Sequence, residues 1–93
     1  MKYKIIPTTK FKKDYKNAQS KGYMMVLLDD VIIALAEGKQ LDPKYKDHSL
    51  KGNLKGYREC HIKPDWLLIY TKNETDLILT LCQTGTHSEL FGK

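Results

Sequence analysis

The pattern of hydrophobic and polar positions begins as a strand and changes to helical spacing after the first proline. Residues 2–7 alternate, which predicts a short strand that ends at Pro7. From residue 10 to residue 21, apolar side chains recur at spacings of four and three and form one narrow stripe, which predicts an amphipathic helix. The stripe consists of Phe11, Tyr15 and Ala18, the N-cap is Thr8 or Thr9, and the helix ends at Gly22.

A second helix is predicted from about Met24 to Glu37, where apolar residues at helical spacing make a broad and mostly buried face. Gly38 ends it. The two helices are expected to form a hairpin packed on a sheet. From Lys39 to Gly56 the periodicity is lost, and prolines, glycines and lysines predict an ordered or semi-ordered loop.

The last third of the chain predicts an antiparallel meander. Strands are expected at Tyr57–Ile62, Trp66–Lys72 and Asp76–Thr84, because each run is apolar and short turns separate them. Gly85 ends the third strand, and residues 86–91 can form one helical turn. With 93 residues, the pattern predicts a single α+β domain over residues 1–93.

Charge is concentrated in two segments of the chain. Residues 1–21 hold seven lysines against Asp14, and residues 44–65 hold five lysines and Arg58 against three acids, so the segments carry +6 and +3. Such clustering attracts a polyanion, of which RNA is the commonest in the cytoplasm. The alternative is that these lysines only keep a small domain soluble.

The apolar runs are too short for a membrane span. None approaches about 20 residues, and the first residues lack a signal-peptide core, so we expect a cytoplasmic protein with no membrane partner. Cys60 and Cys82 lie inside apolar runs, which favours buried reduced thiols over a disulfide or a metal pair.

Three histidines, His48, His61 and His87, supply the candidate chemistry. A neutral imidazole can take or give a proton near pH 7, as acid-base cleavage of RNA requires. Asp65 stands beside the His61 hairpin and could orient an imidazole or act as a base, although a Pro-Asp turn is the simpler interpretation. A zinc site is a weaker alternative, because no close His or Cys pair exists. We therefore expect neither a metal nor another cofactor.

Two aromatic residues could bind RNA directly. Trp66 and Phe91 can offer flat faces on which a splayed base stacks, the usual way in which proteins hold single-stranded RNA. The alternative is that Trp66 belongs to the core and that Phe91 covers the sheet.

Four segments of the sequence carry distinctive motifs. They read KDH at 46–48, LKG at 50–52, KGYRECHIKPDW at 55–66 and TGTH at 84–87, followed by Leu90 and Phe91. Together these segments resemble the YafQ-type toxins of the RelE superfamily. The resemblance extends over nearly the whole chain. It implies a RelE-like fold, in which two N-terminal helices pack on a twisted, mainly antiparallel sheet of about four strands.

The resemblance also implies a function. The expected activity is that of a toxin of a type II toxin–antitoxin system, an endoribonuclease that cleaves mRNA in the ribosomal A site and leaves a 2′,3′-cyclic phosphate. The expected partners are the 70S ribosome, mRNA and a DinJ-like antitoxin, through which the complex binds operator DNA. His48, His61, Asp65 and His87 match the family's catalytic positions, and Trp66 and Phe91 match positions that help to build its site. The expected acid is His87, the base is Asp65 or His48, and His61 positions or stabilises charge.

The sequence departs from the family at Gln83, where an arginine commonly precedes the Thr-Gly-x-His motif and would stabilise phosphorane charge. Arg58, or Lys51 or Lys55 from the loop, could substitute for it. Strict alternation puts Arg58 on the opposite strand face from His61, so its participation needs a bulge or a twist.

Two other functions remain possible from the sequence. A ParE-like gyrase inhibitor would share the fold but would not need the histidines. A non-catalytic ribosome-binding or RNA-binding homologue is compatible with the loss of the arginine at position 83.

Overall fold

The computed structural model describes residues 1–92. These residues form one five-stranded sheet, three α-helices and two short 3-10 helices, η1 and η2. The elements are β1 (Lys4–Pro7), α1 (Thr9–Ser20), α2 (Met25–Ala36), η1 (Pro43–Tyr45), β2 (His48–Ser49), η2 (Gly52–Leu54), β3 (Arg58–Lys63), β4 (Trp66–Asn73), β5 (Ile78–Gly85) and α3 (His87–Phe91).

The sheet has the order β1-β5-β4-β3-β2, and only β1, which is parallel to β5, departs from antiparallel pairing. The predicted α+β class, helical hairpin and meander are therefore confirmed. The expectation of about four strands was one too low, because β2 is a two-residue edge strand inside the predicted loop. Two residues are too few to show alternation. The last strand begins at Ile78 rather than Asp76.

The helix ends follow local side-chain chemistry. Thr8 is the N-cap of α1, and its hydroxyl accepts a hydrogen bond from the Phe11 backbone N–H. Gly22 and Gly38 follow the two long helices with φ near +80°, a conformation that glycine adopts without a Cβ clash. At the other end of the chain, Thr86 caps α3.

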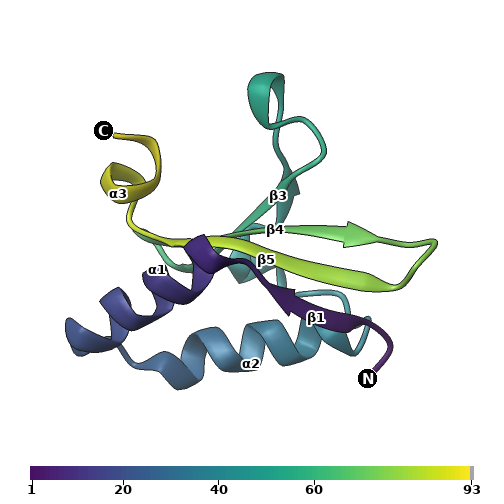
Figure 1. Ribbon diagram of the computed structural model, residues 1–93, viewed down its shortest axis with the longest axis horizontal. Coiled ribbons are helices and arrows are strands. Elements are labelled where there is room, and N and C mark those ends of the chain that lie inside the picture. Colours follow the sequence, from purple (N-terminus) through teal and green to yellow (C-terminus); the bar gives the residue numbers. More distant parts are fainter. Residues whose placement is uncertain (93) are drawn as a thin grey trace.

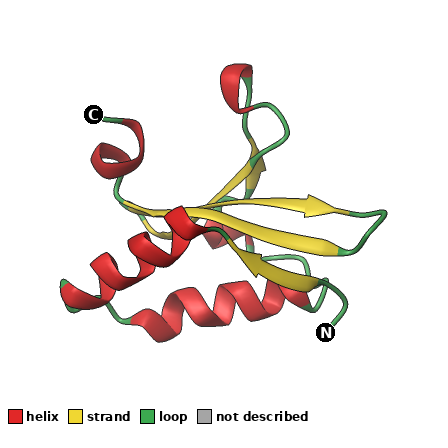
Figure 2. Ribbon diagram, in the orientation of Figure 1, coloured by secondary structure: helices red, strands yellow, loops and turns green. Residues whose placement is uncertain are grey.

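The long helices α1 and α2 cover one face of the sheet, whereas α3 and the loop with η2 stand on the other side (Figures 1 and 2). The core lies between the helices and the sheet, where β3 contributes Cys60 and Ile62 and β4 contributes Leu68 and Tyr70. Cys60 is a buried free thiol, as predicted, whereas Cys82 is free and half-buried. Burial raises the pKa of the Cys60 thiol to about 12, so it stays protonated and unreactive.

The second sheet face is the one that can hold a site. Leu67 and Ile69 of β4 point away from the helices and are buried, at 0% and 1% exposure. Leu67 and Ile69 therefore form a buried apolar floor, and the residues paired with them on the neighbouring strands lie beside it.

None of the helices in residues 1–92 is long and apolar enough to cross a membrane.

Candidate active site

Strand register brings His48, Glu59 and His61 to one face of the sheet. His48 of β2 lies opposite Glu59 of β3, and His61 follows Glu59 by two positions, so the three side chains share a face. Glu59 and His61 lie opposite Ile69 and Leu67 of β4. The three polar side chains thus stand next to the apolar floor, on the face that α1 and α2 leave uncovered.

His87 reaches the same place from the end of the chain. It is the first residue of α3, immediately after the Thr86 cap, and its ring Nδ1 lies 2.6 Å from Oδ1 of Asp65. Its backbone N–H also donates to that oxygen, at 2.9 Å. The backbone N–H and then the ring N–H hold the pKa of the Asp65 carboxyl below its usual value, so it stays ionised.

The three imidazoles form a row with His61 in the middle. The ring centroids of His48 and His61 are 6.3 Å apart, and those of His61 and His87 are 5.9 Å apart. The outer side chains are 49% and 46% exposed, and that of His61 is 20% exposed. A substrate on the surface can therefore reach all three rings.

Glu59 is the site residue that the sequence interpretation missed. Its carboxylate is buried, with Oε1 at 3.4 Å from Nε2 of His48 and 3.5 Å from Nε2 of His61. A buried carboxylate needs partners, and the two imidazoles are the ones available to it here. The available signal was the two-residue spacing from His61, which puts both side chains on one strand face.

Backbone carbonyls set the orientation of two of these rings. Nδ1 of His48 lies 2.6 Å from the Lys46 carbonyl oxygen, and Nδ1 of His61 lies 3.3 Å from that of Pro64. A carbonyl oxygen only accepts, so Nδ1 is the donor in both rings, and Nε2 of each ring faces the Glu59 carboxylate. Asp65 does the same for His87, because its carboxylate accepts from Nδ1.

The expectation that Trp66 stacks on RNA is not supported by its position. Trp66 is 3% exposed, its Nε1–H donates to the Thr84 hydroxyl at 3.0 Å, and its ring packs edge-on against Tyr23 with centroids 4.8 Å apart. The side chain belongs to the core, because successive residues of β4 are buried on both faces of the sheet.

Arg58 lies on the face opposite to the histidines, as strict alternation predicted. Its guanidinium Nη2 donates to Asp47 at 3.1 Å, and the residue is paired across the strands with Tyr70, which also donates to Asp47. The register irregularity in β3 falls between His61 and Lys63, after Arg58, and so does not turn Arg58 toward the site. The suggestion that Arg58 replaces the family arginine is therefore not supported.

The remaining predicted binding residues lie near the site or above it. Gln83 is opposite Ile69 on the histidine face, because β5 has a register shift there that leaves Cys82 without a partner. Its side chain is half-buried. Phe91 is 39% exposed in α3. Lys51 and Lys55 are exposed on either side of η2, in the loop that projects above the sheet in Figure 1.

The geometry of the cluster does not favour a metal. Within residues 1–92, no three His, Cys, Asp or Glu side chains are arranged so that they could hold an ion. Asp65 and Glu59 instead pair with imidazole nitrogens. The arrangement provides two carboxylate–imidazole pairs that can transfer protons, with a third imidazole between them.

Comparisons with known proteins find relatives over nearly the whole chain. The protein family described as "Bacterial toxin of type II toxin-antitoxin system, YafQ" matches residues 3–92. The chain is 43% identical to the mRNA interferase toxin YafQ of Escherichia coli strain K12 over 83 residues, which are 88% of either chain. The family match over residues 3–92 includes every element that carries the histidine row.

Solved structures share the fold. A chain of the crystal structure of the E. coli DinJ–YafQ complex is similar with a TM-score of 0.89 and 38% identity, covering 97% of this chain and 99% of that one. A metal-bound toxin from Helicobacter pylori is similar with a TM-score of 0.89 and 47% identity, covering 96% and 99%. The likeness therefore includes both the sheet and the helices that support the site.

Proposed function

Because this chain belongs to the YafQ family of bacterial type II toxins, we propose that it is an endoribonuclease that cleaves mRNA on the ribosome by acid-base catalysis. The observation that carries the proposal is the row of three imidazoles in which each outer ring faces a carboxylate: His48 faces Glu59, and His87 faces Asp65. RNA cleavage by its own 2′-hydroxyl requires one group that takes a proton and one that gives a proton. Two separate carboxylate–imidazole pairs meet that requirement.

The order of the rings suits an in-line displacement. The scissile phosphate lies over His61, with the 2′-hydroxyl toward His48 and the leaving 5′-oxygen toward His87. His48 removes the 2′-hydroxyl proton through Nε2, and the oxygen attacks phosphorus. His87 then gives its Nε2 proton to the 5′-oxygen as the P–O bond breaks, which yields a 2′,3′-cyclic phosphate and a 5′-hydroxyl.

The carboxylates act through the imidazoles. Glu59 pairs with the imidazolium that forms on His48 and also faces His61 under the phosphate. Asp65, named from the sequence as one of two possible bases, is engaged through Oδ1 by both N–H groups of His87. In this proposal it holds the acid in one tautomer, in the way that a carboxylate orients a catalytic histidine in other hydrolases. The base is therefore assigned to the His48–Glu59 pair.

The partners follow from the same family. The E. coli relative is found in complex with DinJ, and we propose that a DinJ-like antitoxin binds and inactivates this toxin. The substrate is mRNA in the A site of the 70S ribosome, and the toxin–antitoxin complex binds operator DNA through the antitoxin. The histidine row argues against a ParE-like gyrase inhibitor, because such a protein would not need the three histidines.

The test is single-turnover cleavage of mRNA on programmed ribosomes, with the new ends mapped. Wild type should give a 2′,3′-cyclic phosphate, and His87→Gln and His48→Gln should each lower the rate by roughly a hundredfold or more, as loss of a general acid or base does. Glu59→Gln should lower the rate as well. Its matched control is Glu37→Gln, the same change at an exposed residue after α2.

Measuring ribosome binding distinguishes the nuclease from the remaining alternative, a non-catalytic homologue. If wild type and His87→Gln bind ribosomes equally and neither cuts mRNA, the protein is a non-catalytic homologue and the proposal is wrong. If wild type cuts and both histidine variants cut at the same rate, the acid-base assignment is wrong.

A further inference from the structure

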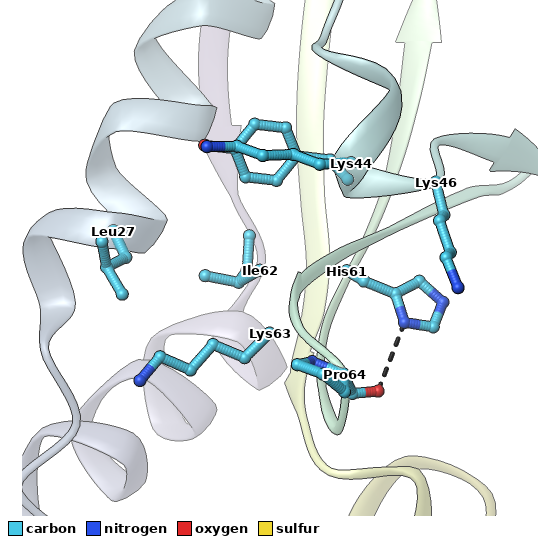
Figure 3. A pocket seen from close by; sticks show the side chains of 8 residues that line it. Leu27, Lys44, Lys46, His61, Ile62, Lys63 and Pro64 are labelled. Carbon is cyan, nitrogen blue, oxygen red and sulfur yellow. Dashed lines mark hydrogen bonds between the residues drawn. The ribbon is translucent and has the colours of Figure 1, made fainter.

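A cavity of about 380 Å³ opens beside the middle of the histidine row, between α2, η1 and the end of β3 (Figure 3). His61 belongs both to the row and to the wall of this cavity, so the two are continuous. The apolar part of the wall consists of Leu27, Tyr45, Ile62 and Pro64. The volume lies within the range of small-molecule sites, about 300 to 1,000 Å³.

The charged part of the wall is entirely basic. Lys44, Lys46 and Lys63 line the cavity, and no acidic residue does. In the part of the chain that the structure describes, these three lysines form no ion pair, and Lys44 lies over the Tyr45 ring at 5.2 Å. Figure 3 shows Lys44 and Lys63 on either side of Ile62 and Lys46 beside the His61 ring. Such a wall fits a ligand with an anionic group and a flat apolar body.

Lys46 connects the cavity to the proposed catalytic residues through its backbone. It has a left-handed conformation, with φ of 49° and ψ of 41°, which few residues other than glycine adopt. In this conformation its carbonyl oxygen meets Nδ1 of His48 while its side chain lines the cavity. Lys46 therefore both orients the His48 imidazole and contributes to the basic wall of the cavity.

We propose that this cavity is a subsite for one nucleotide of the RNA strand, adjacent to the phosphate that is cut. The inference rests on the proposed nuclease function, because a strand that lies over His61 would continue into the cavity. Its base packs against Leu27, Ile62 and the Tyr45 ring, and its phosphate is bound by Lys44 and Lys63. Aromatic packing combined with phosphate neutralisation is the common way in which single-stranded nucleic acid is held.

The test measures binding separately from cleavage. A short single-stranded RNA is titrated into the His87→Gln variant at several salt concentrations, with and without Lys44→Gln and Lys63→Gln. The double change should weaken binding roughly tenfold, the effect of removing charge-assisted hydrogen bonds to one phosphate. It should also reduce the log–log salt slope by about 0.7 for each phosphate that the lysines no longer neutralise.

The matched control is Lys4→Gln with Lys39→Gln in the same background, because both lysines are exposed and lie away from the cavity. This pair changes the net charge equally and should leave the slope nearly unchanged. An equal decrease of affinity in the two double variants, or an unchanged slope in both, would overturn the subsite.

A second measurement tests the apolar half of the wall. Adenosine 5′-monophosphate should shift the methyl resonances of Leu27 and Ile62, and Tyr45→Leu should weaken its binding severalfold more than Tyr57→Leu at an exposed tyrosine. Absence of these shifts would overturn the subsite. If wild type does not cut ribosome-bound mRNA but the lysine pair still governs RNA binding, the subsite stands and the nuclease function fails.

Discussion

Asp47 and His48 are consecutive residues whose side chains lie on opposite faces of the sheet. Asp47 accepts hydrogen bonds from the Tyr70 hydroxyl at 2.5 Å and from Arg58 at 3.1 Å, on the helix-covered face. His48 faces Glu59 on the other side. Burial, together with the hydrogen bond to Asp47, raises the pKa of Tyr70, which therefore stays protonated and donates. These contacts fix the edge strand β2 at the residue next to His48.

Asp47→Asn should therefore lower activity, although Asp47 does not contact the substrate. The change leaves Arg58 without its carboxylate partner, and we expect stability to fall by about 1 kcal/mol, reduced by solvent around the partly exposed guanidinium. The cleavage rate should fall by roughly tenfold to a hundredfold, because small misplacements of a catalytic group are costly. The measurements are single-turnover cleavage, thermal unfolding and the ring resonances of His48.

Asp76→Asn is the control, because Asp76 also accepts a side-chain hydrogen bond but lies in the β4–β5 turn. If Asp47→Asn reduces stability while the His48 resonances and the cleavage rate remain those of wild type, Asp47 has only a structural role.

The fold was predictable because its larger elements repeat a regular pattern. The apolar faces of α1 and α2 and the short apolar runs of β3, β4 and β5 gave the hairpin and the meander. The edge strand β2 was not predictable from the pattern, because two residues show no periodicity and their strand conformation depends on pairing with β3. His48 is placed by that strand, so its position depended on structure that periodicity does not show.

The site was partly predictable for a similar reason. The three histidines and Asp65 were selected by their chemistry, and the structure brings all four together. Glu59 was missed, because a charged residue in a strand usually faces solvent. For Trp66 the sequence left stacking on RNA and burial in the core both open, since β4 is apolar on both faces and alternation cannot show which side chains are covered. The structure places the side chain in the core.

Acid should weaken the attachment of α3, the helix that carries His87. The hydrogen bond from Lys21, and then that from the Thr86 backbone N–H, hold the pKa of Glu89 at about 2, below its usual 4.5. A carboxyl whose pKa is lowered by folding contributes stability above its unfolded value and loses it as the pH falls. The melting temperature of wild type should therefore fall between pH 4.5 and pH 2 by more than that of Glu89→Gln.

The comparison requires a second carboxyl variant, because other acidic groups also titrate in this range. Glu37→Gln removes an exposed carboxylate after α2 and should leave the acid-induced decrease as large as in wild type. If the melting temperatures of wild type and Glu89→Gln decrease by the same amount from pH 5 to pH 2, the assignment of this acid sensitivity to Glu89 is wrong.

Cleavage should not depend on a transition metal. The imidazoles and carboxylates of the histidine row can supply the proton transfers that a metal-bound water would otherwise provide. A chelator that binds zinc and copper but leaves the Mg²⁺ of the ribosome should not change the single-turnover rate. Because the similar Helicobacter pylori toxin was crystallised with a metal, zinc and copper are each added back. Loss of activity with the chelator and its return with either ion would overturn the mechanism.

Lysines on the exposed face of α1 should contribute to ribosome association. Lys12, Lys13 and Lys16 are exposed, whereas Phe11 and Ala18 on the same helix are buried. Replacing all three lysines by glutamine should weaken ribosome binding and lower its salt dependence, by roughly 0.7 to 0.9 in the log–log slope for each phosphate that is no longer neutralised. Circular dichroism should show that the fold is retained.

The control for this helix replaces Lys2, Lys4 and Lys39, three exposed lysines elsewhere, and removes the same charge. A salt slope that changes equally in both triple variants would mean that only net charge matters and that α1 is not a contact surface.

The final prediction concerns Gln83, the position at which the resemblance to the YafQ-type toxins leads us to expect an arginine. Gln83 lies opposite Ile69, which lies opposite Glu59, so its side chain is on the histidine face and half-buried. Gln83→Arg should raise the single-turnover cleavage rate with little change in ribosome affinity, because a guanidinium stabilises charge that grows only in the transition state. Removing one such donor typically costs about a hundredfold to a thousandfold, which limits the gain from restoring it.

Arg58 does not reduce the expected gain, because Asp47 holds it on the other face of the sheet. Gln40→Arg is the matched control, since it adds the same charge at an exposed glutamine after α2. A rise in rate with both variants would indicate general attraction of RNA rather than a contact with the phosphorane. If Gln83→Arg leaves the rate unchanged, another cation supplies this stabilisation, and exposed Lys51 and Lys55 in the loop with η2 become the residues to replace.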